Sequence, residues 1–177
     1  ADLYSFAPVT EITAEDIAVT GKASIGEILL ELPSQGSGLS RNYNNGGSGA
    51  VRIDMRHLGS GRNLILVDGR RWVNSGQGAN GSVDLNSIPS AMVERVEILR
   101  EGASAVYGSD AIAGVINIIT KSDYSGTSAT YQMGEYFDGG GASEVMTFTV
   151  GESSGNSSYV AGVSVVSGGA PGAAPVV

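Results

Sequence analysis

Apolar positions along the 177-residue chain follow two patterns, which divide it into regions of different texture. The stretch Val93–Lys121 holds two apolar runs of strand length, VERVEIL and AIAGVINIIT, which are rich in β-branched residues. Between them, Gly102–Tyr107 is expected to form a short helix that ends at Gly108, because glycine best tolerates a left-handed C-terminal cap. Strand, helical corner and strand in this order predict a compact, buried unit.

Two short amphipathic helices are expected near the N-terminus. A strand at Val9–Ile12 leads to Thr13, which suits an N-cap and has an acidic residue three positions later. This spacing predicts a helix over Ala14–Val19. Ser24 opens a second helix, with a glutamate at the capping-box position, and Pro33 ends it. Both helices carry apolar residues at helical spacing and are interpreted as packing elements.

The middle of the chain predicts a half-buried strand and a hairpin. Val51, Ile53 and Met55 alternate with charged residues, as in a strand with one buried face. Asn63–Val67 is a more apolar strand, and the Asp-Gly pair that follows it is the strongest short signal for a hairpin turn. The hairpin is expected to return through Arg70–Val73.

Two polar loops, Ser34–Ala50 and Asn74–Ser82, flank this hairpin and are rich in glycine, serine and asparagine. The first exceeds the ~12–15 residues expected of a connection without function. Its Tyr43 and the neighbouring asparagines, together with Trp72, suit stacking and hydrogen bonding to a polar ligand. The alternative is that the asparagines and glycines serve only as turn formers.

After Lys121 the pattern changes to three strands separated by short polar turns, at Thr127–Tyr136, Glu144–Val150 and Tyr159–Val165. In each strand, apolar residues alternate with small or polar ones. This period fits the wall of a transmembrane β-barrel and a soluble antiparallel meander equally well. Because a closed membrane barrel takes at least about eight strands, barrel strands here imply a piece of a longer chain.

Composition and charge exclude several classes of function. Charged residues make up 16% of the chain, against ~25% in typical soluble domains, while 41% of residues are hydrophobic. The net charge of −8 argues against nucleic-acid binding, because few cations are available to neutralise phosphates. The sequence has no cysteine, no apolar run of the ~18 residues that a membrane helix needs, and no secretory signal pattern at its start.

Catalytic and metal chemistry find little support. His57 is the only histidine, and the sequence around it matches neither a nucleophile elbow nor another triad motif. The Gly-rich segments lack the Lys-Ser/Thr of a phosphate loop, and a transition-metal site lacks histidine and cysteine ligands. We therefore expect neither an enzyme nor a bound cofactor or metal.

The string EGASAVYGSDAIAGVINIITK resembles the C-terminal signature of the plug domain of TonB-dependent outer-membrane receptors. Four earlier segments are similar to other parts of that domain: Pro8–Ile17, Ile28–Pro33, Leu64–Arg71 and Ile88–Glu97. The resemblance implies an α+β plug domain, with a small mixed sheet and short helices, over residues 1–122. The first three strands of an antiparallel transmembrane β-barrel would then occupy 123–166, and a tail or linker 167–177.

The resemblance also implies a function. Such a plug blocks the pore of a barrel of about 22 strands and gates the active uptake of a scarce nutrient, of the iron-siderophore, cobalamin or oligosaccharide class. The implied partners are the TonB complex on the periplasmic side, a small nutrient ligand, lipid of the bacterial outer membrane and the rest of the barrel. The alternative is a non-transporting envelope module, for binding or structure, that uses a plug-like fold in a larger assembly.

Two sets of residues become candidate sites by this resemblance. The candidate ligand contacts on apical loops are Arg41, Asn42, Tyr43, Asn44, Asn45, Trp72, Asn74, Gln77 and Asn80. The candidate latches between plug and barrel wall are Arg56, Arg95, Glu97 and Arg100. Arg95 and Glu97 are expected on the same strand face as Val93, where half-buried charges need partners, some of them on further barrel strands. The family's Arg-Gly pair is Arg56-His57 here, which puts a tight turn in doubt, and no TonB box precedes Leu3.

Overall fold

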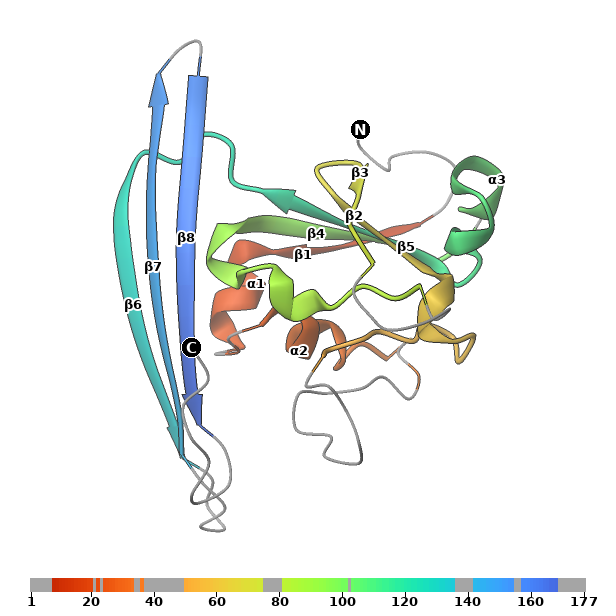
Figure 1. The fold of residues 1–177 in the computed structure, drawn as a ribbon, viewed down its shortest axis with the longest axis horizontal. Helices are drawn as coiled ribbons and strands as arrows, with labels where there is room; N and C mark the ends of the chain where they lie inside the picture. Colours follow the sequence, from red (N-terminus) through yellow and green to blue (C-terminus); the bar gives the residue numbers. More distant parts are fainter. Residues whose placement is uncertain are drawn as a thin grey trace. The chain divides into compact units, whose positions relative to one another are not determined.

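The computed structural model describes residues 8–20, 22, 24–33, 36, 50–74, 81–101, 103–135, 142–154 and 157–168. The chain forms two compact units: one comprises Ala1–Ile88 and Val93–Thr120, the other Pro89–Met92 and Lys121–Val177. Figure 1 shows the helices and strands of each unit. The first is a mixed sheet with short helices and the second an antiparallel sheet, so the predicted fold class is confirmed.

The first unit is built on a five-stranded sheet with the strand order β1-β4-β5-β2-β3. Its strands are β1 (Val9–Thr13), β2 (Asn63–Val67), β3 (Arg70–Arg71), β4 (Val93–Leu99) and β5 (Gly114–Thr120). β2 and β5 are parallel, and the other neighbours are antiparallel. This order places the hairpin of β2 and β3 beside β5, the strand through which the chain leaves the unit (Figure 1).

Short helices complete the first unit. α1 (Ala14–Val19) has the predicted bounds and capping box: the Thr13 hydroxyl accepts from the Asp16 amide at 3.2 Å, and the Asp16 carboxylate accepts from the Thr13 amide at 3.0 Å. α2 (Ile25–Leu29) is shorter than predicted, and the Ser24 hydroxyl accepts from the amide of the second helical residue at 3.2 Å. The other helical segments are α3 (Ser104–Tyr107), η1 (Ser60–Arg62), η2 (Leu85–Ser87) and η4 (Ser109–Ala111).

Apolar side chains pack on both faces of the sheet. The larger cluster joins one face to α1 and α2 and includes Ile25, Leu29, Val96, Ile98, Ile116 and Ile118. The smaller cluster lies on the other face against α3 and η4 and includes Leu64, Leu66, Leu99, Ala103 and Val115. Gly108 ends α3 with a φ of 87°, which a residue with a side chain rarely adopts. Because η4 follows at once, β5 begins at Gly114, three residues later than the apolar run predicts.

Segment 51–55 is buried at its apolar positions, as predicted, but it forms isolated β-bridges instead of a sheet strand. The chain turns at Arg56 and His57, whose φ values of 59° and 56° lie in the left-handed region. The tight turn is therefore present even though histidine stands where the family has glycine. Just before it, the Met55 amide donates to the side-chain oxygen of Asn63 at 3.2 Å, which replaces a strand partner.

In the second unit, β6 (Gly126–Glu135), β7 (Ala142–Ser154) and β8 (Ser157–Gly168) form an antiparallel sheet in chain order, and η3 (Ser90–Met92) joins them. Apolar residues of neighbouring strands are in register, because Tyr131 pairs with Met146 and Met146 with Val165. The exposed apolar side chains on this face are Tyr131, Met133, Met146, Phe148, Tyr159, Val163 and Val165. Among the described residues, no helix has the length and apolarity needed to cross a membrane.

Candidate functional site: a buried polar network in the sheet

The hairpin between β2 and β3 turns at Asp68 and Gly69, as the sequence predicts. Their φ values of 50° and 76° are the positive values that a type I′ turn requires and that these residue types tolerate best. The Asp68 carboxylate accepts from the Thr120 amide at 2.9 Å and from its hydroxyl at 2.7 Å. The Asp68 amide donates to the Ile118 carbonyl at 2.9 Å. The turn is therefore fastened to the last residues of β5.

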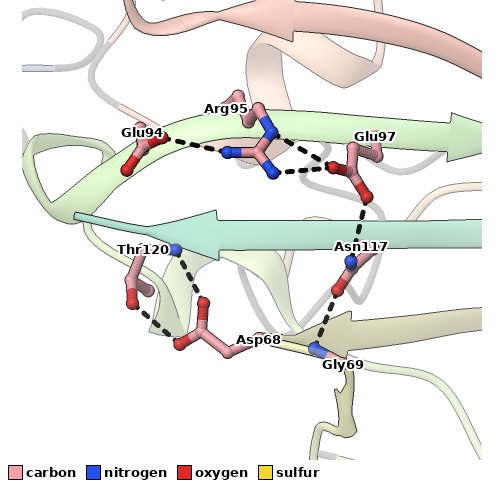
Figure 2. Close-up of polar contacts among 7 residues, drawn as sticks. All are labelled: Asp68, Gly69, Glu94, Arg95, Glu97, Asn117 and Thr120. Carbon is pink, nitrogen blue, oxygen red and sulfur yellow. Dashed lines mark hydrogen bonds and ion pairs between the residues drawn. The ribbon is translucent and has the colours of Figure 1, made fainter. Parts of the chain in front are cut away.

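A line of hydrogen bonds runs from this turn across the sheet (Figure 2). The Gly69 amide donates to Asn117 Oδ1 at 3.0 Å, and Asn117 Nδ2 donates to Glu97 Oε2 at 3.2 Å. On the other side, Arg95 reaches Glu97 Oε1 from Nε at 3.1 Å and from Nη2 at 3.0 Å. Arg95 Nη1 also donates to Glu94 at 2.9 Å. We call Gly69, Asn117, Glu97 and Arg95 the polar network.

The polar network is buried at its centre. Glu97 is 1% exposed and Asn117 is 0% exposed, whereas the Arg95 side chain is 25% exposed. Burial opposes the charge of the guanidinium, but its hydrogen bond to Glu97 and the negative charges of the neighbouring glutamates outweigh this, so the pKa of Arg95 is raised. Glu97 thus has one cationic and one neutral donor, so both oxygens of this buried side chain are hydrogen-bonded.

A β-bulge in β4 corrects the predicted strand face. The pairing of β4 with β5 shifts between Val93 and Arg95, so one extra residue is inserted at this point. Val93 packs in the larger apolar cluster on one face of the sheet. Arg95 and Glu97 contact each other on the opposite face. The expectation that Val93 shares their face was wrong, because strict alternation ignores a bulge.

The four predicted latch residues do not form one cluster. Arg95 and Glu97 lie together in the polar network. Arg56 is exposed, and its Nη2 donates to the Ile112 carbonyl at 2.9 Å. Arg100 follows β4 and is half-buried, and within the described part of the chain its Nε is buried without a hydrogen-bond partner.

Of the predicted ligand contacts, the structure describes only Trp72 and Asn74, and both are exposed. The indole nitrogen of Trp72 donates to Ser87 Oγ at 3.1 Å, and that hydroxyl donates to the Asp84 carbonyl at 2.6 Å. The ring is therefore held at its N–H edge while part of it faces solvent. The other predicted contacts, Arg41, Asn42, Tyr43, Asn44, Asn45, Gln77 and Asn80, lie outside the described residues.

Sequence reasoning missed two members of this site. Asn117 is the single amide in the apolar run GVINIIT, and this was a usable signal, because a buried amide needs partners. Asp68 is predicted only as a turn residue, yet its carboxylate also holds Thr120. The described residues contain no group of three histidine, cysteine, aspartate or glutamate side chains placed to hold a metal ion. The chemistry of the polar network is structural: it joins β4, β5 and the hairpin turn.

Comparison with known proteins identifies the domain. Residues 4–115 match the family model described as the TonB-dependent receptor plug domain. Among solved structures, the chain is similar to the ferric enterobactin receptor PfeA of Pseudomonas aeruginosa in complex with enterobactin. The two are 32% identical over 92% of this chain and 25% of that chain, with a TM-score of 0.68.

Two further receptors share the fold. The siderophore receptor PirA from Acinetobacter baumannii is 28% identical over 89% of this chain and 24% of its own, with a TM-score of 0.64. The ferric citrate transporter FecA, at 21% identity and a TM-score of 0.71, supports the fold alone; the match covers 92% of this chain and 25% of that one. The chain thus spans about a quarter of the length of these receptors. By its sequence match and its fold, the chain belongs to the plug-domain family of TonB-dependent receptors.

Proposed function

We propose that this chain supplies the plug and the first wall strands of an outer-membrane transporter that takes up an iron chelate of the siderophore class. One observation carries the proposal: the match to the plug family over residues 4–115 leads directly into three antiparallel strands with an exposed apolar face. The names of two similar proteins support the substrate class, since they are a ferric enterobactin receptor and a siderophore receptor. An enzymatic role finds no support in this family.

The proposed ligand contacts are the loop residues predicted from the sequence. Trp72 is the best supported of them, because its indole N–H is bonded to Ser87 while the ring remains partly exposed. An aromatic face held in this way can stack on a flat ligand group without first losing much side-chain freedom. Asn74 is exposed two residues further along the same loop and can supply a hydrogen bond.

The proposed gate opens when the TonB complex, from the periplasmic side, delivers work to the plug. A stopper must stay folded until that moment, and the polar network supports this role by joining β4, β5 and the hairpin turn. Of the proposed latch residues, Arg100 is the one best suited to a partner on the barrel wall, because it follows β4 and its side chain is only half-buried. Arg95 and Glu97 already contact each other, so their proposed contribution to the latch is indirect.

Growth on defined iron sources tests the proposed function. A strain lacking the gene is expected to lose growth in iron-depleted medium supplied with one ferric chelate, and to recover with free iron salt in excess. Trp72→Ala is expected to raise the chelate concentration needed for growth, whereas the exposed and neighbouring Val73→Ala serves as its matched control. Unchanged growth of the deletion strain on ferric enterobactin, ferric citrate and other chelates would contradict the proposal.

A further inference from the structure

A short segment of the plug-family match groups with the strands of the second unit. Residues 4–115 match the plug domain, yet Pro89–Met92 belongs to the same compact unit as β6, β7 and β8. η3 occupies this segment and contacts both β7 and β8. The residues on either side, up to Ile88 and from Val93, belong to the five-stranded unit. The chain therefore enters the second unit here and returns to the first within one turn.

The side chain of Met92 packs on a glycine of β8. A Cβ added at Gly162 would lie 2.8 Å from Met92 Cγ, closer than real Cβ atoms approach a neighbour, so a side chain at Gly162 would have to displace Met92. Gly162 stands opposite Thr149 of β7, which is only 2% exposed. By strand alternation, both lie on the face opposite the exposed apolar side chains Phe148 and Val163. η3 thus covers a close-packed patch on the less exposed face of the sheet.

The connector from β5 to β6 is fastened to the same patch. The Lys121 amide donates to the Met92 carbonyl at 2.9 Å, and its Nζ donates to the Ala91 carbonyl at 2.9 Å. The Lys121 ammonium also lies 5.5 Å from the centroid of the Tyr124 ring, within range of a cation–π contact. A Cβ added at Gly151 of β7 would lie 2.7 Å from the Tyr124 carbonyl oxygen. Glycines on two adjacent strands therefore admit the two segments at close range.

We propose that Pro89–Met92 and Lys121–Tyr124 form a foothold on the strands that stays in place while the five-stranded sheet moves. The inference rests on the proposed transport function, in which the plug must rearrange to open the pore. If the foothold stays in place while the sheet moves, the backbone must bend where the chain passes between the two units. These junctions are Ile88/Pro89, Met92/Val93 and Thr120/Lys121. A sheet held at these points can tilt or unfold while its attachment to the wall strands persists.

Native-state hydrogen exchange on the whole receptor tests the foothold without requiring transport. The Met92 amide donates to the Pro89 carbonyl, and the Lys121 amide donates to the Met92 carbonyl. With small amounts of denaturant, we expect these two amides to exchange together with the amides of β7 and β8. They are expected to remain protected after β4 has begun to exchange. Exchange of Met92 and Lys121 in step with β4 would overturn the foothold.

A disulfide between Met92→Cys and Gly162→Cys tests it during transport. The 2.8 Å between Met92 Cγ and the added Cβ is close to the ~3 Å that separates a Cβ from the far sulfur of a disulfide. Oxidised cells are expected to import a ferric chelate within about twofold of the rate of the same cells after reduction. The matched control is Met92→Ser with Gly162→Ser, which adds side chains of similar size that cannot form the bond.

The other outcomes separate the foothold from the proposed function. A loss of roughly tenfold or more on oxidation, reversed by reductant, would show that the segment must leave the strands and would overturn the foothold. Failure of the two cysteines to cross-link would show that Met92 does not pack on Gly162, and it would overturn the foothold. If the wild-type receptor itself imports no chelate, the transport function is refuted, and the exchange experiment alone decides whether the foothold exists.

Discussion

Glu97→Ala is expected to destabilise β4 and β5 by about 3–5 kcal/mol. The Asn117 amide, which is fully buried, loses its carboxylate acceptor, and an unsatisfied buried donor costs about 1–3 kcal/mol. Arg95 loses the Glu97 carboxylate but is 25% exposed and keeps Glu94, so water and that partner limit the loss to ~1 kcal/mol. The space left by the removed side chain adds a cost of about 1 kcal/mol.

Hydrogen exchange of peptides that cover β4 and β5 in the purified receptor measures this free energy. The matched control is Glu94→Ala, which removes a carboxylate that contacts the same arginine but is 46% exposed. This control is expected to cost less than about 1 kcal/mol, as exposed ion pairs do. Glu97→Gln, which keeps an oxygen for Asn117, is expected to fall between the two. Equal free-energy costs of Glu97→Ala and Glu94→Ala would refute the reasoning that the polar network stabilises the sheet because it is buried.

Three further changes test local features of the fold. Hydrogen bonds from the Thr13 amide and hydroxyl lower the pKa of Asp16 below its ordinary value of 3.8. These bonds therefore stabilise α1 fully above pH 3.8, and the stabilisation is lost as the pH falls through the lowered pKa. Asp16→Asn should remove this pH dependence from the exchange of α1 amides. Gly26→Ala should destabilise the receptor by about 1–3 kcal/mol in thermal unfolding, because its Cβ would lie 2.4 Å from Val51 Cγ1; an unchanged melting temperature would contradict this. His57→Gly should stabilise the fold by up to ~1 kcal/mol, because His57 has a φ of 56°, and a lower melting temperature would speak against backbone strain.

Local chemistry made much of this fold predictable. The bounds of α1 follow from Thr13 and its capping partner, and the hairpin follows from Asp68-Gly69, because each signal acts within a few residues. The period-two pattern placed the three strands of the second unit, and the structure extends two of them. The family resemblance, which the sequence match bears out, added the domain to these elements.

Features set by distant contacts were not predictable in the same way. The parallel pairing of β2 with β5 and the bulge in β4 depend on residues far apart in sequence. The polar network is of this kind, since Gly69 and Asn117 are 48 residues apart and Asn117 and Glu97 are 20 apart. Among the predicted latch residues, only the pair two positions apart, Arg95 and Glu97, was brought together. Sequence could name charged candidates, but their partners depended on the pairing of strands.

The proposed gating of iron-chelate uptake by this chain can be measured as the accumulation of radioactive iron in cells. Cells with the complete receptor gene and cells with the gene deleted are supplied with labelled ferric enterobactin or ferric citrate. We expect iron to enter at least about tenfold faster when the gene is present, and only when TonB is also present. Equal accumulation in the deletion strain for every chelate tested would contradict it.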